Sequence, residues 1–441
     1  MRMSRSIATS VLVLCAFAVL AFVAAPPAAA KLDEKEWKAA EGELKRALAT
    51  NPPDYSALAS AVKGVAADQS KRAVDLLLKI GAGLDNAEVF DAVRESLQGM
   101  HEKEALDYMI DSADASDWRI RVILCDALSK VEGDGATKAI VGRLQKDKVG
   151  YVISAAAKSL GKRRDKASAQ IAMPALIEKL AELEKSKDVT WIDVKQALTD
   201  ITGEDFATSS EWRDFWKARG GDFDPAADRG SKEESSTVVR EDEAPKFFKE
   251  KIISKRIMFV IDTSGSMEEQ DPAVGDSPGG KRIERVKSEL IRVVKELKSD
   301  VQFNIVAYSH QIKFWKDPKK AGLQKATPEG KADAIKFVSA LKADGATHTD
   351  EALVKAFESI EINTIVLLSD GAPTKYNAQT NQMEPNPPEK ILEQVKGLNR
   401  LRGVKIHTFC FKVFEKMGGA EPLLDFMKRL AEENGGKMTL I

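Results

Sequence analysis

The sequence predicts two folded domains of different class: an α-solenoid, then an α/β domain whose mostly parallel sheet is wrapped by helices. Apolar residues recur with the 3.6-residue helical period from residue 33 to about 220, without strand signals. From 251 to 441, short apolar runs typical of strands alternate with helical stripes. Residues 222–250 contain few apolar side chains. We therefore assign 31–221 to the helical domain, 222–250 to a flexible linker and 251–441 to the α/β domain.

The first 30 residues have the features of a signal peptide. Two arginines precede the uninterrupted apolar run Val11–Ala25, and the small residues Ala28–Ala30 follow it. This run is shorter than the roughly 20 residues that a membrane-spanning helix needs. We expect cleavage of residues 1–30, with an uncleaved anchor as the alternative. The mature chain would then have no membrane span and would be exported, to a periplasmic, cell-surface or secreted location.

Composition excludes several classes of protein. The chain has 67 Lys and Arg against 68 Asp and Glu, whereas nucleic-acid binders usually have a basic excess. Its four histidines lie far apart in the sequence and do not have the spacing of a zinc site. Cys125 and Cys410 fall in different predicted domains, so we expect two buried thiols and no disulfide.

The helical domain contains a weak internal repeat. Three apolar stripes end at Leu128, Leu160 and Leu198, which are 32 and 38 residues apart. Each stripe begins after a similar short segment, at 117–121, 148–152 and 188–192. This period is the size of a helix pair, and one pair cannot bury its apolar face without stacked neighbours. The segment resembles HEAT repeats, which implies an α-solenoid.

The α/β domain is expected to alternate strands and helices along the chain. The predicted strands are Ile257–Ile261, Val301–Tyr308, Ile312–Trp315, Thr364–Leu368, Val404–Phe411 and Lys437–Leu440. Apolar helical stripes lie at Ile283–Leu297, Ile335–Leu341, Leu353–Ile360, Glu389–Leu401 and Leu423–Leu430. The first and fourth strands are apolar throughout, as expected for strands buried on both faces. Thr327 and Pro328 form a typical helix start, with threonine as the cap.

Oxygen-bearing side chains follow two of the buried strands. Asp262, Ser264 and Ser266 come directly after the first strand, and Asp370 follows the strand that ends at Leu368. Ligands of open α/β sheets bind at the carboxyl edge of the strands. Two carboxylates at that edge would repel each other without a cation. Carboxylate and hydroxyl oxygens suit Mg²⁺ or Mn²⁺.

Together with the segment 345–347, these residues resemble the metal-ion-dependent adhesion site of von Willebrand factor A domains. The resemblance covers residues 251–441 and implies a Rossmann-like fold. The ligands that it implies are Asp262, Ser264, Ser266, Thr347 and Asp370. It also implies that an Asp or Glu of a partner protein completes the coordination of the ion. Hydroxyl ligands are neutral, so a metal held mainly by them retains much of its positive charge.

Two polar insertions depart from this pattern near the site. Residues 271–280 follow the first motif loop and are rich in glycine and proline, which predicts a disordered surface excursion or a segment that shapes the partner face. A second long loop, 377–388, follows Asp370 on the same edge.

We therefore expect an exported, metal-dependent protein-binding protein, an adhesion or scaffold protein that is not an enzyme. Two alternatives are a structural scaffold and an accessory subunit of an ATPase or transporter that binds through its helical domain. A Mg²⁺-dependent phosphotransferase with Asp262 as nucleophile is less favoured. The haloacid dehalogenase pattern needs a second acid two residues later, where Ser264 stands.

Overall fold

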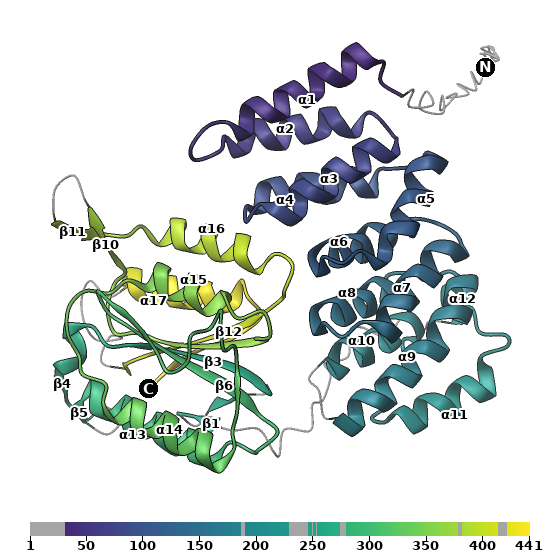
Figure 1. The fold of residues 1–441 in the computed structure, drawn as a ribbon. Coiled ribbons are helices and arrows are strands. Elements are labelled where there is room, and N and C mark those ends of the chain that lie inside the picture. Colours follow the sequence, from purple (N-terminus) through teal and green to yellow (C-terminus); the bar gives the residue numbers. More distant parts are fainter. Residues whose placement is uncertain are drawn as a thin grey trace, which may run out of the picture.

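The structure is a computed structural model, and it shows an all-helical region beside an α/β domain (Figure 1). The residues that it describes are 31–186, 190–228, 246–248, 250–252, 254–273, 279–377, 382–412 and 421–441. The predicted signal peptide and most of the predicted linker lie outside these ranges. Within them, every helix is too short or too polar to cross a membrane.

The helical region runs from α1 to α12. Its α-helices are α1 (Glu34–Leu48), α2 (Tyr55–Ala66), α3 (Lys71–Gly83), α4 (Ala87–Gln98), α5 (Lys103–Asp111), α6 (Trp118–Leu128), α7 (Asp134–Lys146), α8 (Gly150–Gly161), α9 (Lys166–Ser186), α10 (Trp191–Thr202), α11 (Ser209–Arg219) and α12 (Pro225–Asp228). A short 3₁₀ helix, η1 (Ser112–Asp114), precedes α6.

The helices of this region stack in two layers. In one layer α2, α4, α6, α8 and α10 contact each other in turn, and in the other α3, α5, α7, α9 and α11 do so. This stacking is the arrangement of an α-solenoid, in which each helix pair buries its apolar face against its neighbours. The three repeated segments of the sequence lead into α6, α8 and α10, which are consecutive members of one layer. The predicted all-helical fold class is thus confirmed.

The α/β domain alternates strands and helices as predicted. Its main elements are β3 (Arg256–Asp262), α13 (Arg282–Glu296), β6 (Gln302–Tyr308), β7 (Ile312–Phe314), β8 (Gln324–Lys325), α14 (Pro328–Ser339), α15 (Thr349–Phe357), β9 (Thr364–Leu368), α16 (Pro388–Asn399), β12 (Lys405–Cys410), α17 (Glu421–Glu432) and β13 (Met438–Leu440). Three two-stranded hairpins were not predicted: β1 (Lys246–Phe247) with β2 (Glu250–Lys251), β4 (Gln270–Asp271) with β5 (Gly280–Lys281), and β10 (Thr374–Asn377) with β11 (Gln382–Pro385). The predicted cap is present, because the Thr327 hydroxyl accepts the Gly330 N–H at 3.1 Å.

The sheet is mostly parallel, with the order β13-β12-β9-β3-β6-β7. β3 lies in the middle, parallel to both β9 and β6, while β7 and β8 pair antiparallel to β6. Helices α13 and α14 cover one face, and α15, α16 and α17 cover the other (Figure 1). The chain passes from β3 to β6 on one side and later returns to β9 on the other. The carboxyl end of β3 is therefore a topological switch point, where ligands of such sheets bind.

The helical region contacts the opposite edge of the sheet, where the parallel strands begin. The Tyr151 hydroxyl of α8 donates to the carbonyl of Ile362, just before β9. The Arg402 guanidinium, just before β12, lies 5.8 Å from the Trp118 ring centroid and donates to the carbonyl of Ser359 at 3.3 Å. The predicted metal site is therefore at the end of the α/β domain that faces away from these contacts.

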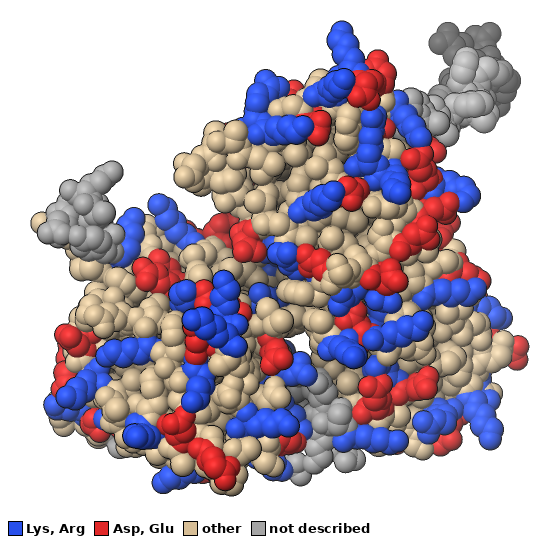
Figure 2. All heavy atoms as spheres, in the orientation of Figure 1, with Lys and Arg blue, Asp and Glu red and all other residues tan. Residues whose placement is uncertain are grey.

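Charges of both signs cover the surface. On the face seen in Figure 2, the Lys and Arg side chains of the described residues lie interspersed with Asp and Glu in both parts of the molecule. This mixture agrees with the formal net charge of −1.

Candidate metal centre

Asp262, the last residue of β3, is fully buried at the carboxyl edge of the sheet. One of its carboxylate oxygens accepts the Ser264 N–H at 2.7 Å, and the other accepts the Ser369 hydroxyl at 2.6 Å. Ser369 follows the neighbouring strand β9, so this hydrogen bond joins the ends of two parallel strands. The central position of β3 thus fixes the carboxylate between two loops.

The loop after β3 directs the hydroxyls of Ser264 and Ser266 toward each other and toward Asp370. The Ser264 and Ser266 hydroxyl oxygens are 3.1 Å apart, and the Ser266 hydroxyl donates to Asp370 at 2.7 Å. The 3₁₀ helix η3 (Gly265–Glu268) makes this turn. Its first N–H, that of Gly265, donates to the carbonyl of Gly345 at 2.9 Å. This bond fastens the first predicted ligand loop to the second.

The second loop needs glycine because it packs very closely. Gly345 has φ +79°, and a Cβ atom there would lie 1.8 Å from Nδ1 of His310. Only glycine tolerates both conditions. Thr347 is fixed two residues later, where its N–H donates to the Thr374 hydroxyl at 3.0 Å and its carbonyl accepts the Thr374 N–H at 2.8 Å.

The third loop brings the remaining oxygens together. A Cβ atom placed on Gly371 would lie 3.0 Å from the Thr347 hydroxyl oxygen and 3.6 Å from that of Ser266. Both hydroxyls therefore border one small region beside the third loop. Asp370, the preceding residue, is 4% exposed and already accepts the Ser266 hydroxyl. The structure thus places all five predicted ligand residues around one end of β3 and β9.

Burial raises the pKa of both carboxyl groups. Burial, followed by the charge of Asp370, raises the pKa of Asp262 to about 7. Burial also raises the pKa of Asp370, although hydrogen bonds from Ser266 and Arg282 oppose this rise. Without a cation, the ionised pair is therefore unfavourable at neutral pH. A divalent ion near both groups would stabilise their charged forms.

The donor set fits a hard divalent cation. Among the described residues, no group of three or more His, Cys, Asp and Glu side chains could hold a metal ion, so a zinc-type cluster does not occur there. The end of β3 offers two carboxylates with three neutral hydroxyls, and oxygen ligands of this kind suit Mg²⁺ or Mn²⁺. The residues to hold such an ion would be Asp262, Ser264, Ser266, Thr347 and Asp370.

Three residues contribute to this geometry without having been predicted to do so. Ser369 holds Asp262, Thr374 holds Thr347, and the buried Arg282 donates to Asp370 at 2.9 Å. Ser369 adjoins a predicted ligand in the sequence, which could have marked it. Arg282 begins a helix whose next residue, Ile283, is part of the apolar stripe, and nothing else in the local sequence indicates that the arginine is buried.

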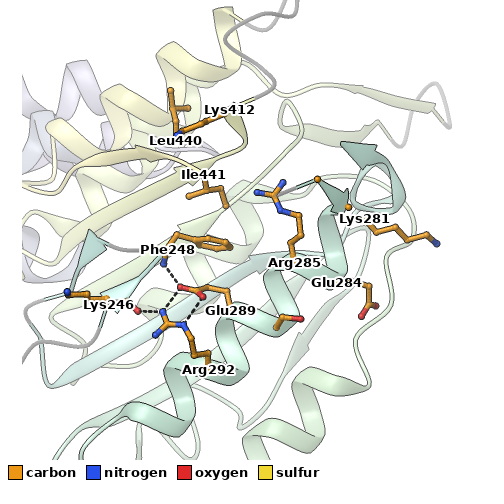
Figure 3. A pocket seen from close by; sticks show the side chains of 13 residues that line it. Lys246, Phe248, Lys281, Glu284, Arg285, Glu289, Arg292, Lys412, Leu440 and Ile441 are labelled. Atoms are coloured by element: carbon orange, nitrogen blue, oxygen red, sulfur yellow. Dashed lines mark hydrogen bonds and ion pairs between the residues drawn. The ribbon is translucent and has the colours of Figure 1, made fainter. Parts of the chain in front are cut away.

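A cavity of about 850 Å³ lies next to this network, between α13 and the last residues of the chain (Figure 3). Phe248, Leu440 and Ile441 provide apolar lining, and Glu289 and Arg292 pair on the α13 side. Arg285 also lines the cavity, and its Nη1 lies 3.8 Å from Asp271. The cavity therefore adjoins the ion pairs around Arg282 without including any of the five predicted ligands among its lining residues.

Comparison with known proteins places the α/β domain in a family. Residues 257–372 match the family model described as von Willebrand factor type A domain. Inter-alpha-trypsin inhibitor heavy chain 4 of Mus musculus is 27% identical over 196 residues, which cover 42% of this chain and 18% of that protein. Von Willebrand factor A domain-containing protein 3A of Homo sapiens is 26% identical over 188 residues, 42% of this chain and 13% of that protein.

Among solved structures, von Willebrand factor type A from Catenulispora acidiphila aligns with a TM-score of 0.32 and 17% identity, over 42% of this chain and 38% of that one. The matched segment covers less than a fifth of the length of each of the two relatives, inter-alpha-trypsin inhibitor heavy chain 4 and von Willebrand factor A domain-containing protein 3A. Residues 257–372 of this chain, with their central β3, form a von Willebrand factor type A domain that follows an all-helical region.

Proposed function

We propose that this chain is an exported protein-binding protein that captures an Asp or Glu of a partner protein through a divalent cation. The cation, Mg²⁺ or Mn²⁺, would be held at the end of β3 by Asp262, Ser264, Ser266, Thr347 and Asp370. The proposal is supported most by the gathering of three hydroxyls and two carboxylates from three separate loops at one end of the sheet.

The chemistry of the donors supports a binding role. A divalent cation at this point would supply a positively charged coordination position for a carboxylate oxygen. The hydroxyls of Ser264 and Ser266 are neutral and leave the cation its charge, whereas an all-carboxylate cage would neutralise it. The relatives that match this domain carry the von Willebrand factor A name or are inhibitor heavy chains, which agrees with protein binding rather than catalysis.

The position of the site supports capture of a large partner. The carboxyl end of β3, where the cation would bind, faces away from the contacts that Tyr151 and Arg402 make between the two parts of the molecule. A partner at this edge would therefore not compete with the helical region. The helical region would serve as a scaffold or as a second docking surface.

Affinity capture with the full chain tests the proposal. Immobilised wild-type protein should retain a partner from an extract of its source in Mg²⁺ and release it in EDTA. Ser264→Ala should abolish the capture, while Ser339→Ala, which removes a hydroxyl from the exposed end of α14, should not. Capture that survives both EDTA and Ser264→Ala would assign binding to the helical region and refute the metal-dependent role.

A further inference from the structure

Arg282 is a buried cation beside the predicted ligands. It begins α13, is 3% exposed, and is charged at every accessible pH. Its Nη1 donates to Asp370 at 2.9 Å, while its Nε and Nη2 donate to Asp271 at 3.0 and 2.8 Å. Asp271 ends β4 and is itself 5% exposed. One guanidinium therefore joins the β4–β5 hairpin to the third ligand loop.

The sequence predicts that residues 271–280 form a disordered excursion or shape the partner face, and the structure describes the two ends of this segment. The two ends of the segment pair in the β4–β5 hairpin, where Asp271 lies opposite Gly280. The hairpin ends are held because leaving Arg282 or Asp271 buried without its partner would be unfavourable. Residues 274–278, in the middle of the segment, lie outside the described residues.

A second arginine completes a buried ionic cluster. Arg285 lies one turn after Arg282 on α13, and its guanidinium is 3.8 Å from Asp271 and 5.0 Å from the Phe411 ring centroid. Together with Asp262 and Asp370, the cluster has three carboxylates and two guanidiniums, a formal charge of −1 when all are ionised. Glu269 also contacts Arg282, but its side chain is 59% exposed and therefore screened by water.

We infer that Arg282 sets the charge of this site, so that a bound divalent cation changes the buried cluster from −1 to +1 and makes it a receptor for one carboxylate. The inference rests on the proposed metal-dependent function. If Arg282 were neutral, the same cation would leave the cluster uncharged, and an acidic side chain would gain less on binding. Arg282 therefore weakens the affinity for the cation and strengthens the affinity for the anionic partner.

The alternative is that Arg282 only anchors the hairpin, and charge variants separate the two roles. Arg282→Gln removes one positive charge from the cluster, and Asp271→Asn removes one negative charge. The double variant removes both charges and leaves the net charge unchanged. If Arg282 acts through its charge, Arg282→Gln should bind Mg²⁺ about tenfold more tightly than the wild type, and Asp271→Asn about tenfold more weakly. Buried charges interact strongly, which is why one charge has so large an effect. The double variant should return close to the wild-type affinity.

Two measurements on the full chain provide the readouts. Titration calorimetry with Mg²⁺ alone measures the affinity for the cation in each variant. With Mn²⁺ bound, broadening of the methyl resonance of added acetate measures how closely a carboxylate associates with the ion. We expect this broadening to fall in Arg282→Gln and to recover in the double variant. Arg292→Gln, which breaks a half-exposed ion pair on the same helix, is the matched control and should change neither readout.

The outcomes separate this inference from the proposed function. Equal Mg²⁺ affinities in the wild type, Arg282→Gln and Asp271→Asn would overturn the inference and leave the metal site intact. A double variant that stays as altered as Arg282→Gln would show that Arg282 acts as an anchor and would also overturn it. Binding that appears only in Arg282→Gln would overturn both proposals, because Arg282 would then take the place of the cation in the wild type. The absence of binding in every variant would overturn both proposals.

Discussion

Replacement of Asp262 by asparagine is expected to stabilise the protein in the absence of metal and to abolish its response to Mg²⁺. The substitution keeps the shape of the side chain. The amide oxygen can still accept the Ser264 N–H, and the amide NH₂ can donate to the Ser369 hydroxyl in place of the present bond. What is lost is the negative charge of a fully buried group.

The magnitude follows from the pKa of Asp262, which rises from 3.8 to about 7 in the folded chain. An acid with a raised pKa destabilises the fold when it ionises, so the stability present below pH 4 is lost as the pH rises to about 7. Each pH unit in this window contributes about 1.4 kcal/mol, which gives on the order of 4 kcal/mol at pH 8. Asp262→Asn has no carboxyl group to ionise at this position, so without metal it should not lose this stability as the pH rises.

Hydrogen exchange of the β3 and β9 peptides in EDTA measures this effect within the α/β domain. Between pH 5 and pH 8, after correction for the intrinsic exchange rate, the wild type should lose protection while Asp262→Asn should not. Addition of Mg²⁺ at pH 8 should restore protection to the wild type alone. Asp344→Asn, an exposed substitution on the second loop, is the control. A metal-free Asp262→Asn variant that is less protected than the wild type at pH 8 would show that the buried charge of Asp262 does not destabilise the fold.

Four other outcomes are expected. Mg²⁺ at ten times its dissociation constant should add about 1.4 kcal/mol to the unfolding free energy of the wild type in calorimetry, and no gain would count against a resident site. Ser266→Ala should weaken Mg²⁺ binding at least roughly tenfold in titration calorimetry while changing stability by under about 1 kcal/mol; unchanged affinity would remove this hydroxyl from the ligand set. Gly345→Ala should cost about 3 kcal/mol in urea unfolding, because the positive φ would be strained and the added Cβ would force the His310 ring to move, whereas Gly435→Ala, with positive φ and open space, should cost about 1 kcal/mol; equal costs would contradict the packing. Arg402→Ala should weaken the contact between the two parts by about 1 kcal/mol, because the guanidinium no longer lies 5.8 Å from the Trp118 ring centroid and 6.0 Å from that of Tyr151, and exchange should rise in α6 and α8; unchanged exchange there would argue against a stable contact.

Much of the fold could be predicted because apolar periodicity reports burial. The buried run Ile257–Ile261 became the core of β3, and the repeated segments led into α6, α8 and α10. The β4–β5 hairpin was not predicted, because it depends on the buried pair between Asp271 and Arg282, which are 11 residues apart. The spacing of apolar residues along a strand or a helix, with a period of two or 3.6 residues, contains no information on polar contacts between distant residues. The same holds for Tyr151, whose bond to Ile362 joins residues 211 positions apart.

The candidate site could be predicted to a similar extent. Asp262, Ser264 and Ser266 lie within five residues at the end of a recognisable strand, so their proximity follows from local chain geometry. Asp370 lies two residues after the end of a second such strand. The role of Arg282 could not be predicted, since an arginine at a helix start is usually exposed, and only the tertiary fold shows that Asp370 and Asp271 surround it.

Anomalous diffraction from crystals of the full chain grown with Mn²⁺ would locate a bound ion. We expect one strong peak at the carboxyl end of β3, within about 2.1–2.3 Å of the Ser264 and Ser266 hydroxyl oxygens, the bonding distance of a small divalent ion to oxygen. Thr347 and Asp370 should border the same peak. No peak at this end of the sheet at saturating Mn²⁺, or an ion bound elsewhere in the domain, would show that these residues do not form the metal site.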